Sequence, residues 1–181
     1  MDPDCVGGRS GRPTRHFDLI LGIPVASSLL FDISAIDFSQ TICDSACLDQ
    51  FLPQTGPMRQ CDRIVWANED YKLCVGIKEV RHDEFWVDHH IKGRPLYPGV
   101  LMIEASAQCA SWQFRHRYKH LGFLGFLRCD EAVFRGQVVP GDTFVILAEE
   151  IDANSRRFIS KVQGLVRGKL VFEAKITGMA I

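Results

Sequence analysis

The stretch HHIKGRPLYPGVLMIEASAQ, residues 89–108, decides the predicted fold. A Gly- and Pro-rich turn that carries His90 leads directly into an apolar segment with one acid, Glu104. Pro98 and Gly99 favour the start of a helix, which we expect to run to about His120 because no further Gly or Pro interrupts it. Apolar residues at helical spacing predict one buried stripe, made of Val100, Ile103, Ala107, Ala110 and Phe114.

Alternating apolar residues predict strands before and after this helix. In residues 71–80, the expected buried face consists of Tyr71, Leu73, Val75 and Ile77, and the opposite face of Lys72, Cys74 and Lys78. Near the C-terminus, one face consists of Leu170, Phe172, Ala174 and Ile176. Turn residues at 167–169 and 138–142 predict two hairpins. Consecutive hairpins give an antiparallel sheet, so the expected fold class is α+β, with a long central helix wrapped by a curved antiparallel sheet.

Length and composition indicate one globular domain with an N-terminal extension. The 181 residues suit about one domain, which we place at residues 49–181, after a partly disordered extension at residues 1–48. With 21 basic and 22 acidic side chains, the net charge gives no reason to expect nucleic acid as a partner. Because no apolar run approaches the ~20 residues of a spanning helix, we expect no membrane span.

The N-terminal region has two interpretations. Arg9, Arg12 and Arg15 precede an apolar run at residues 19–31, which is the order of charge and apolarity in a signal peptide. The acidic start of the chain and Asp18 beside the run argue against export. The alternative is an extension that packs on the domain of a cytoplasmic protein.

The seven cysteines are an odd number without a C-x-x-C pair, which predicts reduced thiols in a cytoplasmic location. Cys43 and Cys47 are the closest pair in the sequence. A metal site at this pair is the alternative interpretation, but no second ligand pair has zinc spacing. We therefore expect buried small side chains here, with no metal and no cofactor.

His90 and Glu104 are the residues on which a functional interpretation rests. Glu104 falls in the second turn of the predicted helix, where a buried carboxylate without a partner is costly. It either pairs or acts in catalysis, or it faces solvent and bonds to nearby backbone. The role of His90 is equally undecided, because a histidine in a turn is often structural and His89 is adjacent to it in the sequence.

Residues 85–108 resemble the signature of the FabZ-type 3-hydroxyacyl-[acyl carrier protein] dehydratases, which reads roughly G-H-F-P-G-x-P-x-x-P-G-V-L-x-x-E-x-x-A-Q. The residues that match in register are His90, Gly93, Pro95, Pro98, Gly99, Val100, Leu101, Glu104, Ala107 and Gln108. This spacing selects His90 rather than His89. Residues 52–65 and 126–142 are similar to two further blocks of the family, so the resemblance extends over about residues 52–176.

The resemblance implies a hot-dog fold that pairs into a homodimer, with hexamers as trimers of dimers in part of the family. It implies reversible dehydration of (3R)-hydroxyacyl-[acyl carrier protein] thioesters to trans-2-enoyl thioesters in fatty acid biosynthesis, without a cofactor. His90 would be the base and Glu104 of the partner subunit the acid, with the Gly99 backbone N–H at the thioester carbonyl. The implied substrate-binding residues are Pro98, Val100 and Gln108.

The sequence departs from the family pattern around the histidine. His89 replaces a Gly, Ile91-Lys92 replaces Phe-Pro, and Gln54 begins the three residues that replace His-Arg-Tyr in the upstream block. Losing a rigid turn and an aromatic wall changes the pocket beside His90. Two alternatives therefore stay open, a hot-dog acyl thioesterase and a non-catalytic acyl-thioester-binding protein. Glu rather than Asp at position 104 resembles the members that do not isomerise their product.

Overall fold

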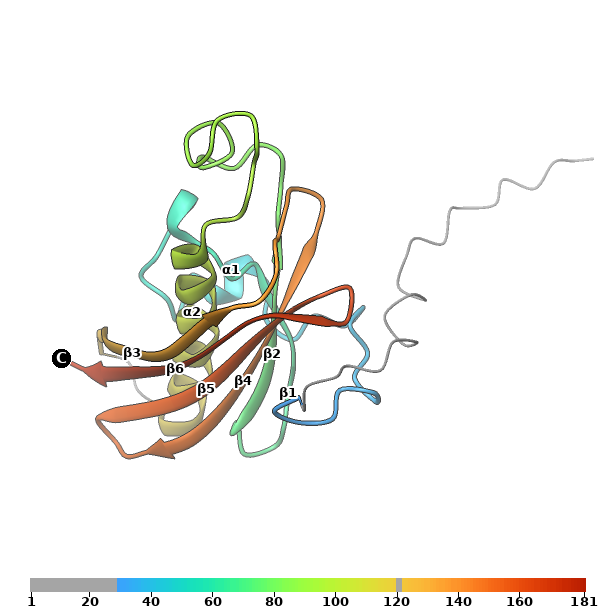
Figure 1. Cartoon of the computed structure of the whole chain (residues 1–181). Helices are drawn as coiled ribbons and strands as arrows, with labels where there is room; N and C mark the ends of the chain where they lie inside the picture. The colour runs from blue at the N-terminus through green and yellow to red at the C-terminus, as the bar shows by residue number, and fades with distance from the viewer. Residues whose placement is uncertain (1–28, 120–121) are drawn as a thin grey trace, which may run out of the picture.

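The computed structural model describes residues 29–119 and 122–181. One long helix, α2 (Gly99–Tyr118), packs against a curved sheet of six antiparallel strands (Figure 1). The strands are β1 (Arg63–Ala67), β2 (Leu73–Glu79), β3 (Leu124–Phe134), β4 (Thr143–Ala153), β5 (Arg157–Val166) and β6 (Lys169–Ala180). Two short helices precede β1, namely α1 (Ser45–Leu48) and the 3-10 helix η1 (Gly56–Met58). The expected α+β class with a long central helix is confirmed.

Helix α2 begins and ends close to the predicted positions. Pro98 is its N-cap, and Lys119 ends it in the left-handed conformation with a φ of 52°. Its last turn carries the cations Arg115 and Arg117, which lie at the negative end of the helix dipole. Among the described residues, no helix is long and apolar enough to cross a membrane.

The face that α2 turns toward the sheet differs from the predicted stripe. Its core-facing residues include Met102, Ala105, Cys109 and Trp112. Val100, which was predicted to be buried, is 70% exposed. Ala107, Ala110 and Phe114 are buried as predicted, but buried residues occur around most of α2, so periodicity does not single out one stripe. This chain therefore leaves the side of α2 that carries Val100 only partly covered.

The strands follow the order β1-β2-β4-β5-β6-β3. β5 and β6 form the predicted hairpin, and its turn residues Arg167 and Gly168 have φ values of 51° and 72°, as a tight hairpin turn requires. The second predicted hairpin is wrong, because β3 pairs with β6 at the edge of the sheet and not with β4. The turn at 138–142 bonds elsewhere, since Gly141 N donates to Val80 O at 2.7 Å. The link from β3 to β4 is thus a crossover.

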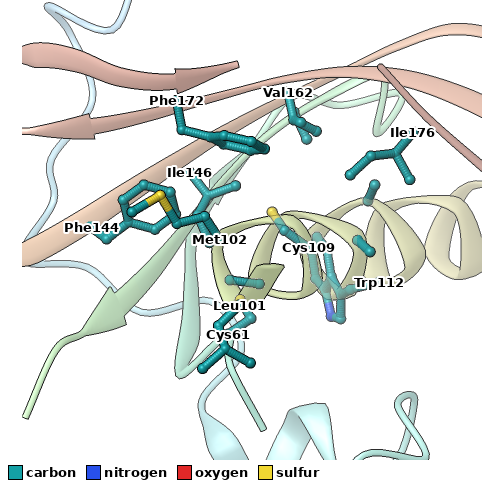
Figure 2. Packing of buried hydrophobic residues seen from close by; sticks show 14 of the residues in the cluster. Cys61, Leu101, Met102, Cys109, Trp112, Phe144, Ile146, Val162, Phe172 and Ile176 are labelled. Carbon is teal, nitrogen blue, oxygen red and sulfur yellow. The ribbon is translucent and has the colours of Figure 1, made fainter. Parts of the chain in front are cut away.

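The main core lies between α2 and the sheet. Figure 2 shows part of it, with Met102, Cys109 and Trp112 of α2 near Phe144, Ile146, Val162, Phe172 and Ile176 of the strands. Cys74 of β2 also faces α2, with its Sγ 3.3 Å from that of Cys109. Val75 and Ile77 are buried as predicted, in a second cluster on the outer side of the sheet, but the opposite face with Cys74 and Lys78 is buried as well. Both faces of β2 are buried, so alternation could not tell which one meets the helix.

The chain's own N-terminal segment covers this outer side of the sheet. The strand residues of the second cluster are Val65, Val75, Ile77, Val145, Leu147 and Leu165. The residues packed over them are Leu29, Leu30, Phe31, Ile33, Ile36 and Phe38. Leu30 N also donates to the side-chain oxygen of Gln163 in β5 at 3.0 Å. The expectation that the extension packs on the domain is confirmed for residues 29–38, whereas most of the signal-peptide-like run lies outside the described residues.

Cys43 and Cys47 are joined by a disulfide at the start of α1. The prediction of reduced thiols is therefore wrong for this pair, because the chain turns into α1 between the two residues and brings their Cα atoms to 5.2 Å. Cys61, Cys74, Cys109 and Cys129 are free thiols, as predicted. Three of these, Cys61, Cys74 and Cys109, are buried in the core next to α2.

Gly164 in β5 is a position where a side chain does not fit. A Cβ there would lie 2.2 Å from two atoms of the buried Phe144 ring. Gly164→Ala should therefore lower the free energy of unfolding by roughly 1–3 kcal/mol, measured by urea denaturation. Gly125→Ala is the control, with an expected change below about 0.5 kcal/mol, because the close contacts of its Cβ would be with the exposed Ile181 side chain, which has room to turn away. An unchanged midpoint for Gly164→Ala would contradict this packing.

Candidate active site

The carboxylate of Glu104 lies in the second turn of α2, half-buried, and two amide side chains bind it. Its Oε1 accepts hydrogen bonds from Gln54 Nε2 at 3.1 Å and from Gln108 Nε2 at 2.7 Å. Neither donor carries a charge, and no ion pair to Glu104 forms among the described residues. The side chain of Glu104 is therefore oriented by two neutral donors.

Gln108 is the centre of the buried polar network behind Glu104. It is 1% exposed, and its Oε1 accepts from the backbone N–H groups of Gln60 at 2.8 Å and Cys61 at 3.0 Å. Its Nε2 donates to Met58 O at 2.7 Å as well as to Glu104. All the hydrogen-bonding capacity of the amide is used in this way. Gln108 thus holds residues 58–61 against α2 and orients Glu104.

Tyr97 connects this network to the segment that precedes α2. Its hydroxyl donates to Gln60 Oε1 at 2.9 Å and lies 3.1 Å from Leu101 O. Burial raises the pKa of Tyr97 far above its usual value, so the phenol keeps its proton and remains a donor. Tyr97 N in turn donates to Val138 O at 2.8 Å. Tyr97, which lies just before α2, is therefore held by its side chain on one side and by its backbone on the other.

His90 lies in the segment between β2 and α2, which projects beyond the end of the sheet (Figure 1). The residue is exposed, and its ring Nδ1 lies 2.8 Å from Leu96 O. A carbonyl oxygen only accepts, so Nδ1 carries the proton and the neutral ring keeps a lone pair on Nε2. The ring of His89 has no hydrogen bond of this kind among the described residues. The structure therefore distinguishes His90 from its neighbour, in agreement with the motif spacing.

A buried ion pair anchors the base of the His90 segment. Lys78 of β2 is fully buried, and its Nζ lies 2.6 Å from Glu84 Oε1 and 3.5 Å from Asp62 Oδ1. Burial raises the pKa of the Asp62 carboxyl. Removing Lys78 would leave the carboxylates of Asp62 and Glu84 without this cation, which is strongly unfavourable. This pairing holds the start of the segment against the sheet.

Gly99 begins α2 at the positive end of the helix dipole. Pro98 O accepts from Leu101 N at 2.9 Å, which closes the first turn. A Cβ at Gly99 would lie 2.6 Å from the ring of Phe134 in β3, so only glycine permits this contact. Phe134 is itself 50% exposed. The N-terminus of α2, the β3 edge and the exposed Val100 therefore form one partly open surface.

No hydrogen bond or ion pair joins His90 to Glu104 within the described chain. β3 lies at an edge of the sheet, and its exposed apolar side chains include Phe126, Leu127, Val133 and Phe134. Together with Val100, these residues leave an apolar surface next to Glu104 that a second copy can cover.

The side chains gathered here suit proton transfer. His90 offers an unprotonated Nε2, Glu104 offers a carboxylate oxygen, and the first turn of α2 offers backbone N–H groups to a developing negative charge. Among the described residues, no group of three or more His, Cys, Asp or Glu side chains is placed to hold a metal ion. The groups that His90 and Glu104 present are of the kind used in acid–base chemistry.

The sequence did not identify two contributors to this arrangement. Gln54 precedes Glu104 by fifty positions, and Lys78 was predicted on a polar outer face. The one available indication for Gln54 was its departure from the family pattern, where a histidine stands first in the block. For Lys78 no local pattern indicates burial, because its partners come from outside β2.

Residues 52–175 match the family model described as the FabA-like domain. This chain belongs to the FabA-like family. Among its relatives, the 3-hydroxyacyl-[acyl-carrier-protein] dehydratase FabZ of Desulforamulus reducens is 36% identical over 134 residues, which cover 74% of this chain and 94% of that protein. The corresponding FabZ of Ralstonia nicotianae is 34% identical over 131 residues, which cover 70% and 79%. The expected family, with its dehydratases of the hydro-lyase class, is confirmed.

The FabA-like relatives also include a longer protein, the bifunctional enzyme LpxC/FabZ of Chlorobaculum tepidum. It is 34% identical over 154 residues, which cover 83% of this chain but only 30% of that enzyme. This chain therefore spans less than a third of that relative, whereas it spans nearly all of the D. reducens protein.

Solved structures agree with the hot-dog fold of the FabA-like family. The dehydratase heterocomplex ApeI:P from Xenorhabdus doucetiae has a TM-score of 0.62 at 14% identity, covering 74% of this chain and 90% of that one. Protein PH1136 from Pyrococcus horikoshii has a TM-score of 0.55 at 16% identity, covering 73% and 92%. At these identities the likeness concerns the fold alone, and with the family match it confirms the expected hot-dog architecture.

Proposed function

We propose that this protein reversibly removes water from (3R)-hydroxyacyl-[acyl carrier protein] thioesters in fatty acid biosynthesis. The observation that carries the proposal is the Glu104 carboxylate, held on α2 by two amides and following an oriented His90 at the family's spacing. Relatives named as 3-hydroxyacyl-[acyl-carrier-protein] dehydratases supply the reaction class. The product is the trans-2-enoyl thioester.

His90 acts as the general base in the proposed mechanism. Its Nε2 takes the C2 proton, which the thioester carbonyl acidifies, and the electrons of the C2–H bond form the C2–C3 double bond. The C3–O bond breaks as Glu104 of the partner subunit gives its proton to the leaving hydroxyl, which departs as water. Hydration follows the same steps in reverse, with His90 as acid and Glu104 as base.

The start of α2 binds the thioester in this proposal. The Gly99 backbone N–H donates to the carbonyl oxygen, where negative charge develops, and the helix dipole adds to this stabilisation. Pro98 and Val100 contact the acyl chain near C3. Gln108 acts on the substrate indirectly, because it holds Glu104 in place.

A second chain completes the proposed site. The exposed apolar surface of Val100 and β3 pairs two copies, so that His90 of each chain meets Glu104 of the other. The acyl group arrives on the phosphopantetheine arm of an acyl carrier protein, and we place the protein in the cytoplasm. The further assembly of dimers into hexamers can be tested by light scattering.

Hydration of crotonyl-[acyl carrier protein] tests the function directly. Loss of the enoyl-thioester absorbance, without release of a free carrier thiol, is the expected result. Thiol release detected with a thiol reagent would identify a thioesterase instead. Binding of crotonyl-[acyl carrier protein] with unchanged absorbance would indicate a non-catalytic acyl-binding protein and contradict the proposal.

A further inference from the structure

We propose that Gln54 is a positioning residue that assigns the acid proton of Glu104 to one particular oxygen, Oε2. The inference rests on the proposed function, in which Glu104 donates that proton to the leaving hydroxyl. Gln54 lies outside the helix and belongs to the segment between α1 and η1. Its Nε2 donates to Glu104 Oε1 at 3.1 Å, beside the 2.7 Å bond from Gln108.

Two donors on one carboxylate oxygen determine where a proton can sit. Oε1 of Glu104 has two lone pairs in the carboxylate plane, and the amide N–H groups of Gln54 and Gln108 take up both. A proton on Oε1 would displace one of these bonds. Oε2 has no hydrogen-bond partner among the described residues, so the neutral acid carries its proton there. Oε2 is therefore the oxygen that exchanges a proton with substrate.

The orientation of the Gln54 amide favours a functional role over a structural one. Turning the amide over would place its own oxygen against the carboxylate, so the donor orientation is set by Glu104. In this orientation, Gln54 Oε1 is buried and has no hydrogen-bond partner among the described residues. An unpaired buried acceptor is unfavourable for folding. The bond to Glu104 is thus kept at a cost in stability, which is typical of a functional site.

Arg59 keeps Gln54 in place. The Arg59 guanidinium donates to Gln54 O, and it forms an ion pair with Asp49 at 2.8 Å. It also lies 3.4 Å from Ser45 O in α1. The Arg59 side chain is only 8% exposed, so these contacts hold the backbone of Gln54 against the neighbouring segment. The amide that reaches Glu104 therefore starts from a fixed point.

The variant Gln54→Met tests the inference, because methionine keeps the length of the side chain and removes the N–H donor. We expect kcat for hydration of crotonyl-[acyl carrier protein] to fall about 10- to 30-fold, with KM changed less than about threefold. The low-pH limb of the kcat profile should move to higher pH, because the ionised carboxylate that accepts a proton from water loses a donor. Gln54→His, which keeps an N–H donor of similar reach, should restore most of kcat and the original limb.

Gln50→Met is the matched control, since Gln50 is exposed on the same segment and bonds no catalytic group. It should leave kcat and the pH profile as in wild type. A wild-type kcat and an unmoved low-pH limb in Gln54→Met would overturn the role of Gln54 and leave the dehydratase proposal standing. Equal losses in Gln54→Met and Gln54→His, with no movement of the limb, would also overturn it. An inactive wild type would instead refute the proposed function itself.

Discussion

His90→Ala and Glu104→Gln are each expected to lower kcat for hydration of crotonyl-[acyl carrier protein] by at least ~100-fold, the usual effect of losing a general acid or base. His90→Ala removes the Nε2 lone pair. Glu104→Gln preserves the shape of the side chain and an oxygen that accepts from Gln54 and Gln108, but it can no longer exchange a proton. Stopped-flow absorbance of the enoyl thioester measures both variants.

His89→Ala is the matched control for this experiment. His89 is exposed and adjacent to His90, but its ring lacks the orienting bond to a backbone carbonyl. Its substitution should change kcat by no more than about twofold, as for other surface changes. A larger loss in His89→Ala than in His90→Ala would mean that the motif spacing selects the wrong histidine.

Two inactive variants should restore activity when they share a dimer. If His90 of one chain meets Glu104 of the other, a dimer of one His90→Ala chain and one Glu104→Gln chain has one site with both groups intact and one with neither. Random pairing of coexpressed chains makes half of the dimers mixed, so the preparation should recover about a quarter of wild-type kcat. The two variants purified separately and assayed singly remain below ~1%.

A double variant provides the control for this complementation. Pairing His90→Ala with a chain that carries both His90→Ala and Glu104→Gln leaves every site without its histidine, so no activity should return. If the mixture of single variants also stays inactive, although mixed dimers are present by mass spectrometry, His90 and Glu104 act within one chain. That outcome would contradict the two-chain site while leaving the first prediction intact.

The parts of the fold that were predicted correctly depend on residues close together in the sequence. Pro98 and the absence of later helix breakers fixed the limits of α2, and the turn at Arg167–Gly168 fixed the β5–β6 hairpin. The pairing of β3 with β6 was not predicted, because it joins residues 38 to 56 positions apart. The prediction of which side of α2 meets the sheet failed for a related reason. Apolar side chains occur all around this helix, and only packing in the folded protein selects among them.

The site was predictable to the extent that it follows one local motif. The resemblance of the motif with His90, Gly99 and Glu104 to the dehydratase family implies their roles, and the structure adds the bond that orients His90. Gln54 could not be predicted, because its contact with Glu104 depends on how the segment before β1 folds against α2. The Cys43–Cys47 disulfide was also not predicted, because an odd number of cysteines in the chain does not show whether one particular pair is bonded.

Residues 29–38 have a consequence for how this protein can be handled. They cover the outer face of the sheet, where Val75, Ile77 and Leu147 lie. A chain shortened to begin at Leu52, where the family match starts, would present that face to water as a broad apolar surface. Exposed surfaces of this kind associate back to back and lower solubility. The segment therefore keeps the sheet from self-association, and shortened forms of the protein should retain it.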